Sequence, residues 1–127
     1  MDILIQKSTK THPYICFDPV SKIYEISGHS FPEDPHETFK PIFEWVDNNI
    51  SKLNHKMELN IQSDYFNSIS NRLLLKLLRM LEIQVQAGKD IEIVWSYDDE
   101  EIQNDGTIFS RLVNIPFRFV FKPFDSE

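Results

Sequence analysis

Two strand-like segments flank a leucine-rich helical segment in the middle of this chain, and this arrangement limits its fold more than any other feature. In residues 57–61 ("MELNI") apolar and polar side chains alternate, as in a half-buried strand, and residues 91–95 ("IEIVW") read as a buried strand. Between them, apolar residues recur at the spacing of one helical face until Gly88 ends the pattern: Leu74, Leu77, Leu78, Leu81 and Val85. Strands that alternate with helices predict an open, largely parallel sheet with helices packed on it.

The N-terminal third predicts a β-hairpin and then a first helix. Residues 13–28 read as two short strands around a turn at residues 18–21, and Gly28 ends the second strand. A helix start follows at residues 34–37, and apolar residues then keep the spacing of one helical face: Phe39, Ile42, Phe43, Val46, Ile50 and Leu53. Because an interior proline removes a backbone hydrogen bond, Pro41 leads us to expect a regular helix only from about Lys40.

The C-terminal third predicts a third helix and a closing strand. Residues 98–114 fit a helix that breaks at Asp105-Gly106, with Ile108, Leu112 and Val113 facing inward. Residues 117–121 ("FRFVF") predict a strand with its three phenylalanines on one side. The expected order is therefore β-β-α-β-α-β-α-β. We predict one α/β domain over residues 1–127, with a mixed, mostly parallel sheet and an N-terminal hairpin.

Composition and charge argue against two classes of partner. The formal net charge is −7, and no run of five or more residues is rich in Lys and Arg, whereas nucleic-acid binding depends on neutralising phosphates with these residues. No apolar run approaches the roughly 20 residues that span a bilayer, and the first ten residues do not resemble a signal peptide. The single cysteine, Cys16, cannot form an intrachain disulfide. We expect a cytoplasmic protein that binds neither nucleic acid nor membrane.

The side chains that usually carry catalysis do not form a known pattern here. The four histidines have no metal-ligand spacing and there is no Cys-x-x-Cys: the histidines are His12, His29, His36 and His55. The acidic run 98–101 lacks the spaced oxygens of a calcium loop and suits a helix start. With three glycines, the chain has neither a Gly-rich phosphate loop nor a Gly-x-Ser-x-Gly elbow. We expect no enzyme activity, no metal and no cofactor.

The junction Asn67-Ser68 is the strongest candidate for a functional site. It lies between the strand at 57–61 and the longest predicted helix, and functional residues of open α/β sheets gather at such carboxyl ends of strands. Ser and Asn are common helix caps, so one interpretation is that both residues only satisfy unpaired N–H groups. The other is that a hydroxyl is displayed for phosphorylation, because a helix start favours an anion and a phosphoserine adds roughly −1.5 to −2 charges.

Three sequence blocks resemble the SiaC-type regulatory phosphoproteins, a bacterial family with a STAS-like fold. The first is "GHSFPEDPHETFKPIFEW", similar to the family's Gly-x-Ser-x-Pro-Glu segment with its following Phe, Pro and Trp. The second, "DYFNSISNRLLLKLL", is similar to the Asn-Thr/Ser junction ahead of the central helix. The third, "VWSYDDEEIQNDGTIFSRLVNIPF", is similar to the Trp-x-Tyr, acidic and Pro-Phe pattern. The blocks follow in the family's order, and the resemblance extends over most of the chain, from about Pro13 to Phe124.

The resemblance implies a phosphorylation switch at Ser68, the residue after the junction asparagine. Family members are substrates of a dedicated Ser/Thr kinase and a PP2C-type phosphatase, and the unphosphorylated form of the best-known member binds and stimulates a diguanylate cyclase, which promotes biofilm formation. This chain has Ser where that member has Thr, and Ile69 where a small hydroxyl residue is common. We expect five residues near Ser68 to shape the helix start or contact the partner: Tyr65, Phe66, Asn67, Ser70 and Asn71.

Two alternative functions remain open at this point. One is a STAS-like adaptor that binds its partner constitutively, without phosphorylation. The other is a small-ligand or enzymatic role, which would need a concave polar pocket. The sequence does not identify the effector, the kinase or the oligomeric state, and it leaves open whether Trp45 is a core or a contact residue.

Overall fold

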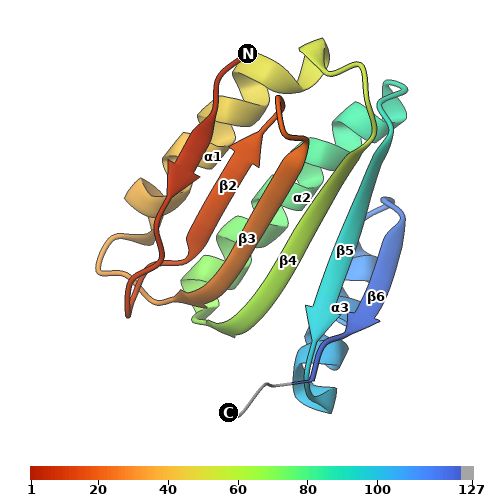
Figure 1. Cartoon of the computed structure of the whole chain (residues 1–127). Coiled ribbons are helices and arrows are strands. Elements are labelled where there is room, and N and C mark those ends of the chain that lie inside the picture. The colour runs from red at the N-terminus through yellow and green to blue at the C-terminus, as the bar shows by residue number, and fades with distance from the viewer. Residues whose placement is uncertain (124–127) are drawn as a thin grey trace.

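The structure, a computed structural model, describes residues 1–123. Over these residues it contains six strands, three α-helices and one short 3₁₀ helix (Figure 1). In chain order they are β1 (Leu4–Gln6), β2 (Tyr14–Asp18), β3 (Ile23–Ser30), α1 (Pro35–Asn49), η1 (Ile50–Lys52), β4 (Met57–Phe66), α2 (Ser68–Gln86), β5 (Ile91–Tyr97), α3 (Glu100–Leu112) and β6 (Phe117–Phe121). None of the helices among residues 1–123 has the length and apolar character needed to cross a bilayer.

The strands form one sheet in which the spatial order equals the chain order. β1, β2 and β3 are antiparallel neighbours, and β3 to β6 are parallel. Each parallel crossover contains a helix, and all three helices lie on the same face of the sheet (Figure 1). The core lies between this helical layer and the sheet. The predicted α/β class, mixed sheet and N-terminal hairpin are confirmed, while β1 is an additional edge strand that the sequence analysis did not predict.

The second hairpin strand continues beyond Gly28, where the sequence analysis expected it to end. Gly28 has a φ of 99° and pairs with Ser63 of β4, and the next pair joins His29 to Tyr65. Asp64 is therefore an extra residue in β4, as in a β-bulge, and glycine supplies the positive φ that the irregular backbone needs. β4 correspondingly extends to residue 66, so "SDYF" is the end of a strand rather than part of the helix start.

Helix α1 runs without interruption through Pro41, which contradicts the expectation that regular helix begins near Lys40. Asp34 caps it by accepting a hydrogen bond of 3.2 Å from the Glu37 N–H. Phe39 and Ile42 on either side of the proline are fully buried. Burial of these side chains offsets the single backbone hydrogen bond that proline cannot make.

Trp45 of α1 is a core residue, which answers the question that the sequence left open. Its side chain is 4% exposed, and its Nε1–H donates a 2.8 Å hydrogen bond to the Asp2 carbonyl. Its ring packs edge-on against Phe17, with the ring centroids 5.0 Å apart. Trp45 thus connects α1 to the hairpin and to the N-terminal residues.

Helix α3 has a different inward face from the predicted one, and it does not break at Gly106. Ile108 and Leu112 are 56% and 45% exposed, whereas Phe109 is buried, as is Val113 directly after the helix. Gly106 is buried against the Trp95 indole, where an added Cβ would lie 2.5 Å from the ring. The expected inward position of Val113 is confirmed; those of Ile108 and Leu112 are wrong because a glycine, not an apolar side chain, makes the closest contact with the sheet.

This packing predicts that Gly106→Ala destabilises the protein. The new methyl group would overlap the rigid Trp95 ring, and overpacking of this kind costs about 1–3 kcal/mol. Urea unfolding followed by tryptophan fluorescence would measure the loss. Asn104→Ala, an exposed site on the same helix, is the matched control and should change stability by less than about 0.5 kcal/mol. Equal stability of the two variants would contradict the close packing of α3 on β5.

Candidate functional site

Two of the sequence blocks meet where β3 and β4 end at the carboxyl edge of the sheet. The backbone N–H of Asn67 donates a 2.9 Å hydrogen bond to the carbonyl of Ser30. The hydroxyls of Ser30 and Ser70 are 2.7 Å apart and share a hydrogen bond, and both side chains are fully buried. A buried polar pair of this kind is satisfied only by its partner, so it fixes the first turn of α2 against the end of β3.

Asn67 is the N-cap of α2. Its side-chain oxygen accepts a 2.9 Å hydrogen bond from the Ser70 N–H, and its carbonyl accepts one of 2.9 Å from the Asn71 N–H. The Asn71 side-chain amide in turn donates to the Phe66 carbonyl at 3.2 Å. The interpretation of Ser68 as a cap is therefore wrong, because the cap position belongs to the residue before it.

Ser68 is the first residue of α2 and is exposed. Within residues 1–123 its hydroxyl makes no hydrogen bond to another side chain or to the backbone. The N–H groups in the first turn of a helix have no partner inside the helix, and the helix dipole favours negative charge there. A hydroxyl at this position can be modified without removing a contact of the fold, and an anion on it is electrostatically tolerated.

Exposed apolar side chains lie on either side of Ser68. Tyr65 is 54% exposed and Ile69 is 42% exposed. The Tyr65 ring packs edge-on against Phe31 from the first sequence block, with the centroids 5.7 Å apart. Surface aromatics of this kind are common anchors of protein interfaces. Phe66, by contrast, is 6% exposed and belongs to the core.

The five residues expected around Ser68 thus divide into two groups. The side chains of Tyr65, Asn67 and Asn71 are exposed or half-buried and can be reached by another molecule. Phe66 and Ser70 are buried beneath the junction, Phe66 in the core and Ser70 in its hydrogen bond with Ser30. The sequence pattern could not separate these groups, because Ser70 is a small polar residue whose burial depends on Ser30, forty positions earlier.

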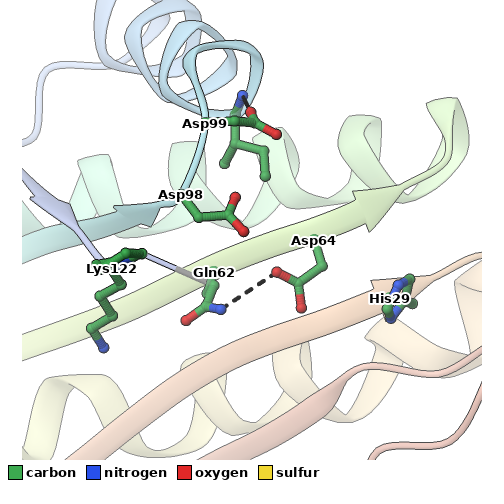
Figure 2. Close-up of a pocket in the computed structure, with 8 residues that line it drawn as sticks. His29, Gln62, Asp64, Asp98, Asp99 and Lys122 are labelled. Carbon is green, nitrogen blue, oxygen red and sulfur yellow. Dashed lines mark hydrogen bonds between the residues drawn. The ribbon is translucent and has the colours of Figure 1, made fainter. Parts of the chain in front are cut away.

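A hollow with a volume of about 520 Å³ lies at this edge of the sheet (Figure 2). Polar side chains from β3, β4 and the β5–α3 junction line it: His29, Gln62, Asp64, Asp98 and Asp99, with Lys122 after β6. Gln62 donates to Asp64 at 3.4 Å, and Asp99 caps α3 by accepting from the Ile102 N–H at 2.9 Å. His29 lies at one end of the hollow, away from Asp98 and Asp99 (Figure 2).

These side chains do not converge as a catalytic or metal site requires. In the part of the chain that the structure describes, no group of three or more His, Cys, Asp or Glu side chains could hold a metal ion. The carboxylates that do reach this edge from α3 were expected only as a solvated helix start, and Asp99 does have that role. Their position beside Asp64 follows from the sheet topology and not from any local sequence signal.

The cap assignment makes a prediction about two adjacent residues. Asn67→Ala removes the acceptor of the Ser70 N–H and should lower the free energy of unfolding by about 1 kcal/mol. Ser68→Ala removes no hydrogen bond within the described residues and should stay within about 0.5 kcal/mol of wild type. Both values come from denaturant titrations followed by circular dichroism. If Ser68→Ala is the more damaging change, the cap has been assigned to the wrong residue.

Comparison with known proteins places this geometry in a family. The chain is 26% identical over 111 residues to an uncharacterised protein of Pseudomonas aeruginosa strain UCBPP-PA14, and the match covers 86% of this chain and 88% of that protein. Solved structures of SiaC from Pseudomonas aeruginosa have the same fold. The apo-SiaC crystal structure superposes with a TM-score of 0.87 at 25% identity and covers 94% of this chain and 99% of SiaC.

A further structure is that of the diguanylate cyclase SiaD in complex with its activator SiaC from Pseudomonas aeruginosa. It matches with the same TM-score of 0.87 at 25% identity, over 94% of this chain and 99% of the matched chain. The family model for the SiaC family regulatory phosphoproteins matches residues 6–122, which is nearly the whole chain. The chain therefore belongs to the SiaC family of regulatory phosphoproteins.

Proposed function

We propose that this protein is a non-enzymatic signalling protein whose binding to an effector is controlled by phosphorylation of Ser68. One observation carries the proposal: Asn67 supplies the helix cap, and the exposed Ser68 hydroxyl makes no hydrogen bond to any other residue among 1–123. The SiaC family is a family of regulatory phosphoproteins, which supports a phosphorylated residue in this chain. Ser70, the next hydroxyl along the helix, is fully buried and is a poor acceptor for a kinase.

Phosphorylation at this position would change the surface and leave the fold intact. A phosphoserine adds roughly −1.5 to −2 charges and three strong acceptor oxygens. At a helix start such an anion is favoured by about 0.3–1 kcal/mol, so the helix itself should not be disrupted. A partner that packs on Tyr65 and Ile69 would meet a large, hydrated dianion between them, and desolvating it is costly.

We propose a diguanylate cyclase as the effector, activated by the unphosphorylated form. The support is the SiaC complex, in which SiaC is the activator of the diguanylate cyclase SiaD. A Ser/Thr kinase and a PP2C-type phosphatase would set the phosphorylation state in the cytoplasm. Contact with the effector would come from Tyr65, Asn67 and Asn71, while Phe66 and Ser70 would hold these residues in place.

The proposal predicts that a negative charge at residue 68 weakens effector binding. Isothermal titration calorimetry with the diguanylate cyclase of the same organism would compare Ser68→Glu, Ser68→Thr and wild type. We expect Ser68→Thr to bind like wild type and Ser68→Glu to bind about tenfold or more weakly, because a charge must be desolvated at the interface. Ser51→Glu, an exposed serine in η1, is the control for net charge and should bind normally.

The same titration separates the proposal from a constitutive adaptor. An adaptor without phosphorylation control would bind the cyclase equally well as wild type and as Ser68→Glu. That result would overturn the switch and leave only the interaction surface.

A further inference from the structure

β6 forms one edge of the sheet, and its outer side has no partner among residues 1–123. The Ile93 N–H donates to the Pro116 carbonyl at 2.9 Å, and the Lys122 N–H donates to the Tyr97 carbonyl at 2.8 Å. The even-numbered residues of this segment therefore pair with β5. Because backbone groups alternate in direction along a strand, the odd-numbered residues point their N–H and C=O groups away from the sheet. These are the three phenylalanines of β6: Phe117, Phe119 and Phe121.

The two edges of the sheet differ in how they are protected against further pairing. β1, at the opposite edge, has three residues, whereas β6 has five. Natural edge strands are usually short or carry charged side chains, which discourage pairing with another strand. The charged residue of β6, Arg118, contacts Glu58 and Glu92 of its own chain, and the other four residues of the strand are apolar. β6 is therefore suited to pair with a further strand.

The three phenylalanines form a row of rings on the core side of β6. Phe117 and Phe119 are half-buried against the core, with their ring centroids 6.1 Å apart. Phe121 is 57% exposed, although its ring lies 5.6 Å from that of Tyr97 between centroids. Helix α3 contacts β5 and β6 and lies behind them without extending past β6 (Figure 1). The row is therefore open on the side where a further strand would be added.

The apolar pattern of β6 ("FRFVF") is symmetric about Phe119, so the strand is complementary to itself. We propose that β6 pairs in antiparallel orientation with β6 of a second copy of this chain, with Phe119 of both copies beside the two-fold axis. In this register Phe117 of each copy lies opposite Phe121 of the other, and the outward backbone groups of all three phenylalanines obtain partners. Opposed residues of an antiparallel pair lie on the same face, so the two rows of rings pack against each other.

This pairing leaves the start of α2 uncovered in both copies. Strands β3 to β6 are parallel, so antiparallel pairing through β6 places the carboxyl edges of the two copies at opposite ends of the combined sheet. Ser68 follows the carboxyl end of β4, and each copy therefore presents its Ser68 away from that of the other. A dimer of this kind can bind two effector molecules. Self-pairing of β6 and phosphorylation of Ser68 are independent of each other.

Sedimentation equilibrium of the full chain at increasing concentration tests the self-association. One pair of five-residue edges is a small interface, so we expect a dimer with a Kd between about 1 µM and 1 mM. Phe121→Glu places a charge opposite Phe117 of the second copy and should raise this Kd about tenfold or more. Ile83→Glu, which replaces a similarly exposed apolar residue of α2, is the matched control and should dimerise like wild type.

The register of the pair is tested at Val120, which lies opposite Arg118 of the second copy. Val120→Glu places unlike charges opposite each other, and Val120→Lys places like charges there. We expect the Glu variant to dimerise several-fold more tightly than the Lys variant. Both variants lose the same valine, so their difference reports the contact with Arg118. Net charge alone predicts the reverse order, because the chain already carries −7.

Three outcomes would overturn the self-pairing of β6. The first is a monomer at all concentrations up to about 1 mM, which would leave this edge to a strand of another protein. The second is a dimer that persists unchanged in Phe121→Glu, and the third is equal or reversed affinity of the two Val120 variants. Circular dichroism spectra like that of wild type verify the folding of each variant. None of these outcomes affects the switch at Ser68, which the effector titration tests separately.

Discussion

The function of this protein depends on a sheet whose spatial order equals its chain order. Parallel crossovers are right-handed. When each parallel strand is added on the same side of the previous one, as here, all of the crossover helices therefore lie on one face of the sheet. The carboxyl ends of β3, β4 and β5 then meet at one edge, together with the starts of the helices that follow them. Residues from three distant sequence blocks are brought together there, and nothing in the candidate site lies far from that edge.

At this edge, the residues that hold the start of α2 differ from the residue that exposes its hydroxyl to solvent. Asn67 caps α2, and the Ser30–Ser70 hydrogen bond fixes its first turn from the buried side. Ser68, between them, is free of both tasks. The two serines of one turn therefore have opposite environments, although they are the same residue type and only two positions apart. This separation would allow a phosphoryl group on Ser68 to change the surface while the junction beneath it stays folded.

The sequence was sufficient to predict the features that depend on local patterns. The leucine stripe of α2 and the strands on either side of it were predicted from their periodicity, and Asn67-Ser68 was correctly placed at the strand–helix junction. The family resemblance correctly indicated the fold and the family. These predictions succeeded because side-chain spacing and capping chemistry act within a few residues of the chain.

Features that depend on distant contacts could not be predicted in this way. β1 is three residues long and gains its stability from β2, and the positive φ of Gly28 accompanies a bulge at Asp64 in the neighbouring strand β4. The inward face of α3 was predicted wrongly because Gly106, which faces the sheet, has no apolar side chain that a sequence pattern could detect. Only its close contact with the Trp95 ring of β5 shows that it faces inward. The polar hollow lined by Asp64, Asp98 and Asp99 was not predicted at all, since Asp64 is far from the other two in sequence and only the topology makes them neighbours.

Phosphopeptide mapping of the protein purified from its own host tests most directly whether Ser68 is phosphorylated. We expect a single added phosphoryl group on Ser68, none on the buried Ser70 of the same turn, and loss of the added mass in Ser68→Ala. A protein that remains unmodified after incubation with host lysate and ATP, or that carries its phosphoryl group at another residue, would contradict the account.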